Sequence, residues 1–210
     1  MAGLGRRCVI DPRDANYPLK APSSTRTSRH WTSRGVMDQG RTSQCVAYAC
    51  TKWLTTSPVI NRPVDPAALY HEAQLLDVWE GENYDGTSVR AGMKALQRRG
   101  LISEYRWATA AEDVISYVLE SGPVVMGTTW TSGLSMPDRR GFISFDGDNL
   151  GGHAWLIVGA SRKLGAVRMI NSWGSRWGNE GGRAWVSFED LDRLIQDWGE
   201  AAVATEVRVA

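Results

Sequence analysis

The chain has 210 residues, of which 42% are hydrophobic and 22% charged, and a net charge of only +1. This length is enough to bury a substantial core, as one domain or as two small lobes. A nearly neutral chain has no field that would favour nucleic acid or an anionic membrane as its main partner. None of its apolar stretches approaches the roughly 20 residues that span a bilayer. We therefore expect a globular protein with neither of these partners, and the oligomeric state stays open.

Cysteine usage indicates the compartment. The three cysteines, Cys8, Cys45 and Cys50, are too few for a disulfide framework. Residues 1–8 also lack the apolar segment of a secretory signal. We expect free thiols, and the cytoplasm or another reducing compartment.

Residues 1–35 form a basic arm, with seven Lys or Arg residues against two Asp. The run 22–29 is its least structured part, because Pro, Ser and Thr dominate there. We expect this arm to be solvated and to lie over the surface of the protein.

Helical patterns follow within residues 36–121. The first helix has apolar residues on one face from Val46 to Leu54, with Ser43 as a possible cap. Asp65-Pro66 is typical of an N-cap followed by proline at the first helical position, and it opens the second helix. Two further helices are expected, one capped by Thr87 or Ser88 and ended by Gly100, and one near 111–121.

After Pro123 the pattern changes to short β-rich runs separated by glycines. Helices first and strands second describe an α+β chain, with a helical lobe over 36–121 and a β-rich lobe over 122–210. The expected strands are 124–126, 154–158, 167–170, 184–188 and 203–209, with a short helix around 191–195.

Cys45 stands where a thiol could become reactive. A cysteine is a nucleophile only as a thiolate, and the unsatisfied N–H groups and dipole at a helix start lower a thiol pKa. Gln39, six residues earlier, can donate its side-chain amide to an oxygen that becomes negative, and the backbone N–H of Cys45 can be a second donor. We expect Cys45 to be the nucleophile and Gln39 an oxyanion donor.

His153 and Asn171 can complete this chemistry. His153 follows two glycines at the start of a strand-like run, where a side chain can face a cleft. It can pair with Cys45 as thiolate and imidazolium and then protonate a leaving amine. Asn171 ends the 167–170 strand and can orient the imidazole, although an Asn in that place is commonly just a turn residue. The expected catalytic residues are therefore Cys45, His153, Asn171 and Gln39.

The order Gln39, Cys45, His153 and then Asn171-Ser172-Trp173-Gly174-Ser175-Arg176-Trp177-Gly178 resembles the papain-like cysteine peptidases over most of residues 35–190. The resemblance implies one catalytic domain with two lobes, a helical N-terminal lobe and an antiparallel β-barrel-like C-terminal lobe, with the active site in the cleft. It also implies a cysteine endopeptidase that hydrolyses peptide bonds through a thioester acyl-enzyme.

This chain departs from the family pattern in three places. Val46 stands where the family usually has Trp, and Thr42 stands where secreted members carry a disulfide cysteine. His153 lies 108 residues after Cys45, against papain-like spacings of roughly 130–150, so about 25 residues of loop are missing. No catalytic atom is lost, and the trimmed loops and the changed neighbour of Cys45 bear on substrate preference alone.

The resemblance further implies which residues line the substrate cleft. Trp173 would cover the Asn–His hydrogen bond, and Gly86 resembles the glycine segment that pairs with an extended substrate by β-strand addition. The side chains are small and no acidic residue aligns with them, so we expect a pocket for Phe, Tyr or Leu that disfavours Arg. Around this pocket, for the residue second from the cut, the expected residues are Gly127, Gly151 and Ala154, with Thr87 and Ser88 as the opposite wall; Gly152 is also expected to bind substrate.

Two other functions use the same residues or the same fold. One is acyl transfer to an amine, as in a transpeptidase or isopeptidase, and the other is a non-catalytic peptide-binding module. A peptide or protein is the expected partner in each case. No metal or organic cofactor is implied, because the three histidines are scattered and no Cys/His pair has zinc-ligand spacing. For the arm over 1–35, the alternative to a solvated segment is a self-inhibitory segment that crosses the cleft.

Overall fold

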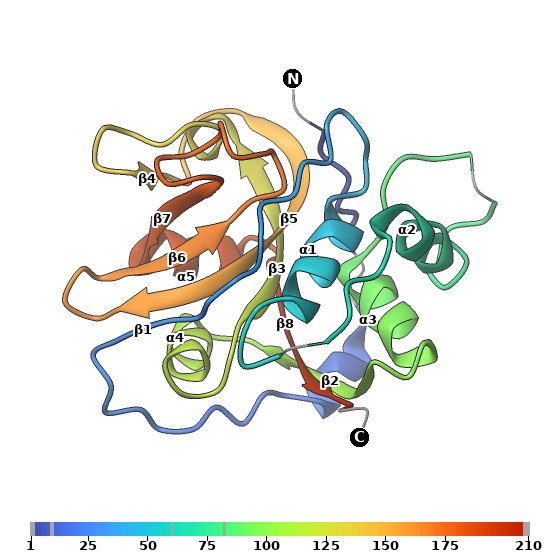
Figure 1. The fold of residues 1–210 in the computed structure, drawn as a ribbon, viewed down its shortest axis with the longest axis horizontal. Helices are drawn as coiled ribbons and strands as arrows, with labels where there is room; N and C mark the ends of the chain where they lie inside the picture. Colours follow the sequence, from blue (N-terminus) through green and yellow to red (C-terminus); the bar gives the residue numbers. More distant parts are fainter. Residues whose placement is uncertain (1–2, 9–10, 60, 82, 208–210) are drawn as a thin grey trace.

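Helices α1 to α3 gather on one side of the molecule and a sheet on the other in the computed structural model, which describes residues 3–8, 11–59, 61–81 and 83–207 (Figure 1). Helices α4 and α5 lie on the sheet side. The helices are α1 (Cys45–Leu54), α2 (Pro66–Gln74), α3 (Val89–Arg98), α4 (Ala111–Glu120) and α5 (Phe188–Gln196), with 3-10 turns at Pro12–Asn16 and Ser132–Leu134.

The strands form one eight-stranded sheet with the order β2-β8-β3-β5-β6-β7-β4, and β1 pairs with β5. Every pair is antiparallel except β4 with β7, which is parallel. The α+β class expected from the sequence is confirmed. The strands are β1 (Ser28–His30), β2 (Ile102–Ala108), β3 (Val124–Thr131), β4 (Phe142–Ile143), β5 (Asn149–Ser161), β6 (Ala166–Ile170), β7 (Arg183–Ser187) and β8 (Glu200–Glu206).

Local capping explains where two of the helices begin. The Asp65 carboxylate accepts hydrogen bonds from the backbone N–H groups of Ala67 and Ala68 at 3.2 and 3.3 Å, just before α2. The Ser88 hydroxyl accepts from the Ala91 N–H at 3.1 Å and opens α3. Ser43 does not cap α1, because the helix begins at Cys45 with Gln44 in the N-cap place and no side-chain cap.

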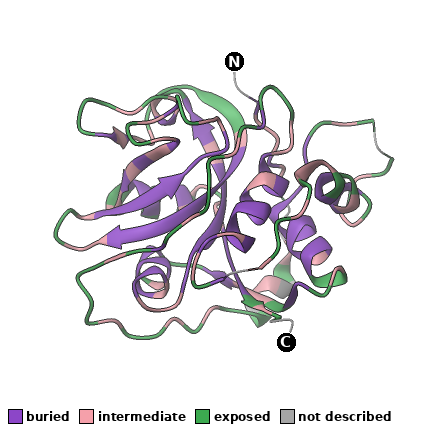
Figure 2. Ribbon diagram, viewed as in Figure 1, coloured by how far each residue is buried: buried purple, intermediate pink, exposed green. Residues whose placement is uncertain are grey.

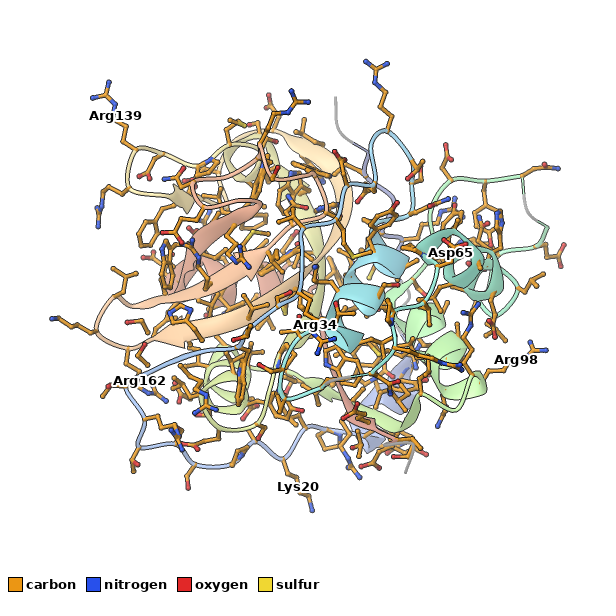
Figure 3. All side chains as sticks on the ribbon, in the orientation of Figure 1. Lys20, Arg34, Asp65, Arg98, Arg139 and Arg162 are labelled. Carbon is orange, nitrogen blue, oxygen red and sulfur yellow. The ribbon has the colours of Figure 1, made fainter. Side chains whose placement is uncertain are left out.

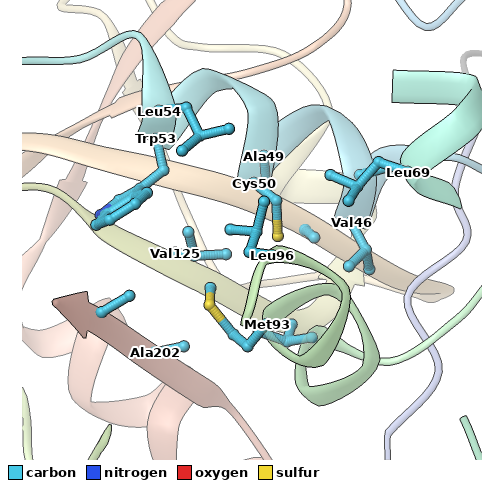
Figure 4. Packing of buried hydrophobic residues seen from close by; sticks show 14 of the residues in the cluster. Val46, Ala49, Cys50, Trp53, Leu54, Leu69, Met93, Leu96, Val125 and Ala202 are labelled. Carbon is cyan, nitrogen blue, oxygen red and sulfur yellow. The ribbon is translucent and has the colours of Figure 1, made fainter. Parts of the chain in front are cut away.

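Both faces of the sheet are buried, and they divide the core in two (Figure 2). Alternate residues of β3 belong to opposite clusters: Val125 faces α1 and α3, whereas its neighbours Val124 and Met126 face α4 and α5. Figure 4 shows the first cluster, where Cys50 packs among apolar side chains of α1 and α3. Cys50 is therefore a buried structural thiol.

The sheet register positions the residues of the candidate site. On β3 and β5, Gly127 lies opposite Ala154 and Thr128 opposite His153. β6 pairs with β5 and ends at Ile170, opposite Leu156, so Asn171 leaves the sheet beside the middle of β5. α1, whose first residue is Cys45, packs against β5. Among the described residues, no helix is both long and apolar enough to cross a membrane.

Candidate active site

Cys45 is the first residue of α1, and its thiol is fully buried. Backbone N–H groups near the sulfur, among them that of Ala154 on β5, favour a thiolate, but burial outweighs them and raises the pKa of Cys45 to about 12. The expected lowered pKa is therefore wrong for this conformation, because no water reaches the sulfur.

His153 and Asn171 are hydrogen-bonded, with 2.8 Å between Nε2 of the imidazole and Oδ1 of the amide. Both side chains are buried, and Oδ1 of Asn171 also accepts from the Ser172 N–H at 2.7 Å, which holds the amide in place. His153 Nδ1 has no hydrogen-bond partner among the described residues, so this nitrogen is free to serve a thiol. Burial lowers the pKa of His153 to about 4.

Two tryptophans enclose the imidazole. The Trp173 ring centroid lies 4.8 Å from that of His153, and the Trp130 ring meets His153 edge-on at 4.6 Å. Trp173 was expected at this hydrogen bond, whereas Trp130 was not among the expected site residues. Together the rings exclude water from the His–Asn pair, which strengthens the hydrogen bond.

Gln39 is held beside the same site by the segment after Asn171. Its side-chain Oε1 accepts from the Ser172 hydroxyl at 2.6 Å, and its backbone N–H donates to the Ser172 carbonyl at 2.8 Å. Its Nε2 donates to the carbonyl of Gly3 at 3.1 Å and to that of Thr42 at 2.7 Å. The amide that was expected to serve an oxyanion therefore already holds a peptide carbonyl.

That carbonyl belongs to the N-terminal segment, residues 3–8, which lies in the site and not in solvent as expected. The Gly152 carbonyl accepts from the backbone N–H groups of Gly5 and Arg6, both at 3.0 Å. On the opposite side, the Thr87 N–H donates to the Gly5 carbonyl at 2.9 Å and the Thr87 carbonyl accepts from the Arg7 N–H at 2.9 Å. Trp173 Nε1 also donates to the Gly3 carbonyl, at 3.2 Å.

The other residues expected to bind substrate lie around this segment. A Cβ on Gly86 would come within 2.2 Å of the Gly5 carbonyl oxygen, and one on Gly151 within 3.4 Å of the Leu4 side chain. Gly127 faces Arg6, whose Nε would lie 3.1 Å from an added Cβ. Ser88 is buried as the cap of α3, and Ala154 is buried next to Cys45.

The acidic residue of this pocket, Glu200, was missed from the sequence. Its carboxylate accepts from Arg6 Nε at 2.9 Å and lies at the start of β8, 194 residues along the chain. A lone Glu at a strand start carries no local signal, so only the sheet order brings it here. No cluster of three or more His, Cys, Asp or Glu side chains that could hold a metal occurs within the described ranges.

Comparisons with known proteins agree on the fold. No protein-family model matches the chain, and no curated protein is significantly similar to it. Among solved structures, xylellain, a cysteine protease from Xylella fastidiosa, matches with a TM-score of 0.79 and 21% identity, over 99% of this chain and 97% of its own. Procathepsin L2 proteinase from Tenebrio molitor larval midgut matches at 0.70 and 17%, over 97% and 78%. Bromelain protease from Ananas comosus, in complex with the E64 inhibitor, matches at 0.64 and 15%, over 87% and 100%. The chain therefore has the fold of the papain-like cysteine peptidases.

Proposed function

We propose that this protein is a cysteine endopeptidase that hydrolyses peptide bonds through a thioester acyl-enzyme. The observation that carries the proposal is the buried 2.8 Å hydrogen bond between His153 and Asn171, on the strand whose next residue, Ala154, has its backbone N–H near the Cys45 sulfur. An unpartnered Nδ1 on that histidine leaves one ring nitrogen for proton transfer.

Each residue has one role in the proposed reaction. His153 Nδ1 takes the thiol proton as the Cys45 sulfur attacks the substrate carbonyl, and the same nitrogen then protonates the leaving amine. Gln39 Nε2 and the Cys45 backbone N–H stabilise the oxyanion. Asn171 keeps the imidazole in one tautomer and orientation. Water then attacks the thioester and releases the acyl product.

The thiol and the imidazole are both neutral while the N-terminal segment is in place, because burial raises the pKa of one and lowers that of the other. Opening the site to water removes this desolvation and favours the thiolate–imidazolium pair. We therefore assign this conformation to the closed, inactive state of the proposed peptidase.

Peptide hydrolysis tests the proposal, with parent and variants all carrying Gly5→Ala, whose new Cβ would lie 2.1 Å from the Ser43 carbonyl oxygen and so disfavours the closed state. We expect Cys45→Ala to abolish turnover and Gln39→Ala to lower kcat by about 10²–10³, the usual loss for one oxyanion donor. Cys50→Ala is the matched control, since Cys50 is a buried thiol of the same helix, and it should retain activity. Hydrolysis by Cys45→Ala at the parental rate would overturn the proposal. Analysis of the products, as free acids or as amides, separates hydrolysis from acyl transfer.

A further inference from the structure

The Arg6 side chain occupies a closed pocket beside the candidate catalytic residues. Its Nε donates to Glu200 Oε2 at 2.9 Å, and its Nη2 donates to the backbone carbonyl of Trp198. The side chain of Arg6 is 4% exposed and that of Glu200 is 11% exposed, so the ion pair is almost fully removed from water. Removing either member of so deeply buried an ion pair would leave the other charge without a partner, which is strongly destabilising.

The pocket has the shape and the acceptors that a guanidinium requires. A Cβ at Gly127 would lie 2.5 Å from the Val89 side chain and 3.1 Å from Arg6 Nε, so the glycine leaves room for the arginine stem. Glu200 Oε1 is buried without a partner among the described residues, which leaves a second acceptor for a planar, forked donor.

Trp198 supports the pocket through a strained backbone. It has φ 60°, the one positive φ found at a non-glycine position in the described part of the chain. This conformation is costly for a bulky residue and persists only where the surroundings impose it. The carbonyl of Trp198 receives the Arg6 guanidinium, so the strain is located at the wall that recognises it.

The main chain of the same segment is held as closely as its arginine. Gly5 fits between two backbones: a Cβ on it would lie 2.1 Å from the Ser43 carbonyl oxygen, and its own carbonyl lies against Gly86. Arg7 anchors the outer end, with its guanidinium 4.6 and 4.7 Å from the ring centroids of Trp79 and Tyr84. These contacts are independent of the Glu200 pocket.

We propose that the cleft contains a guanidinium-binding pocket closed by Glu200, which selects arginine side chains of peptides, and that Arg6 of the N-terminal segment Gly3–Arg7 fills this pocket as an internal inhibitor. The inference rests on the proposed peptidase function for the nature of the competing ligand. It replaces the expectation that the pocket disfavours Arg, which assumed that no acidic residue reaches this wall.

The N-terminal segment Gly3–Arg7 inhibits because it occupies the cleft but does not place one of its own peptide bonds for cleavage, as a substrate would. In a substrate, the residue second from the cut is next to the residue at the cut. In the N-terminal segment, the carbonyl at Gln39 is that of Gly3, and two residues, Leu4 and Gly5, separate Gly3 from the arginine in the pocket. The chain takes a longer path through the cleft, and the Gly3 carbonyl is fixed by both Gln39 and Trp173.

The rate of Cys45 alkylation by iodoacetamide, followed by peptide mass mapping of the full-length protein, tests the inhibitor without needing turnover. Arg6→Ala should accelerate it by about a hundredfold or more, because removing one member of a buried ion pair strongly disfavours the closed state. Gly5→Ala should accelerate it by about tenfold through its clash with Ser43, a modest closed-state strain. Lys20→Ala removes an exposed cation of the same arm, which points into solvent in Figure 3, and should leave the rate unchanged.

A synthetic peptide of residues 1–10 with Cys8→Ser should restore protection of Cys45 when added to the Arg6→Ala protein, and the same peptide with Arg6→Ala should not. Equal alkylation rates in parent, Arg6→Ala and Gly5→Ala proteins would overturn the inhibitor. Circular dichroism checks that each variant is folded, and Gly5→Ala keeps the test valid if Arg6→Ala unfolds.

Peptide libraries test the specificity of the pocket. In the Gly5→Ala background, peptides with Arg at the second position from the cut should be cleaved faster than peptides with Leu. Adding Glu200→Gln should lower kcat/KM for the Arg peptides by about tenfold or more relative to the Leu peptides, since a charge-assisted bond is lost. A preference for Leu in both proteins would overturn the guanidinium pocket. If Cys45 were alkylated faster in the variants but no peptide were cleaved, the proposed peptidase function would be refuted, whereas the proposal that the N-terminal segment closes the site would stand.

Discussion

Glu200 and His153 are buried groups of the site whose shifted pKa values change the stability of the protein with pH in opposite directions. Burial raises the pKa of Glu200 from 4.5 to about 7, with Arg6 only partly offsetting it, and burial lowers the pKa of His153 from 6.5 to about 4. Between pH 4.5 and 7 the folded protein therefore binds more protons at Glu200 than the unfolded chain does, so stability falls as pH rises. Between pH 4 and 6.5 the unfolded chain binds more protons at His153, so stability rises with pH.

The two contributions oppose each other over pH 4.5 to 6.5, where both groups titrate. A change in pKa from 4.5 to about 7, or from 6.5 to about 4, corresponds to about 3 kcal/mol at 1.36 kcal/mol per pH unit. Glu200→Gln removes the falling contribution and keeps an acceptor for Arg6. The stability of this variant relative to the parent should therefore increase by about 3 kcal/mol between pH 4.5 and 7.

Urea unfolding at constant ionic strength, at half-unit steps from pH 4 to 8, measures this difference. His153→Ala is the opposite control: relative to the parent, it should gain about 3 kcal/mol as pH falls from 6.5 to 4. All other ionisable groups are common to variant and parent, so the difference between the curves isolates each residue. If the free energy of unfolding changed with pH in the same way for Glu200→Gln and the parent, the claim that Glu200 lies in a buried pocket would be refuted.

Two further predictions concern the cleft and the imidazole. Gly86→Ala should speed Cys45 alkylation, because Gly86 has φ +89° and the new Cβ would clash with the Gly5 carbonyl. Gly100→Ala is its control: Gly100 has φ +67° but open space around it, so this variant should carry only the backbone strain of about 1–2 kcal/mol and leave the alkylation rate unchanged. Asn171→Ala should lower kcat by less than the 10²–10⁴ that general acid–base catalysis contributes, since only the orientation of the ring is lost, and steady-state kinetics on an arginine peptide would show a larger loss if Asn171 did more.

Local signals in the sequence were enough for the elements whose ends are set by neighbouring residues. The Asp65-Pro66 and Ser88 caps predicted the starts of α2 and α3, because each cap bonds to N–H groups two or three residues away. Strand β2 was missed. Its residues, Ile102–Ala108, do not alternate cleanly, and they become a strand by pairing with β8 about a hundred positions later.

The candidate site also has a part that the sequence predicts and a part that it does not. Gln39, Cys45, His153 and Asn171 stand in recognisable motifs, and the structure brings Gln39 to the His153–Asn171 pair through Ser172. The chemical state of the site could not be predicted. A helix N-terminus favours a lowered thiol pKa, but Cys45 is fully buried, and desolvation reverses the direction.

The order of synthesis gives the Arg6–Glu200 contact a further meaning. At about 5–20 residues per second, translation of the 194 residues between them takes roughly 10–40 s. Strand β8 is made after every other strand, yet it lies between β2 and β3 within the sheet. During this interval the helix that carries the nucleophile exists without the wall of its pocket, and Arg6 has no carboxylate to bind. The pocket that holds Arg6 can therefore form only once residues 200–206 have been made, so the proposed peptidase would lack this pocket, and its proposed inhibitor would lack a partner, until the end of synthesis.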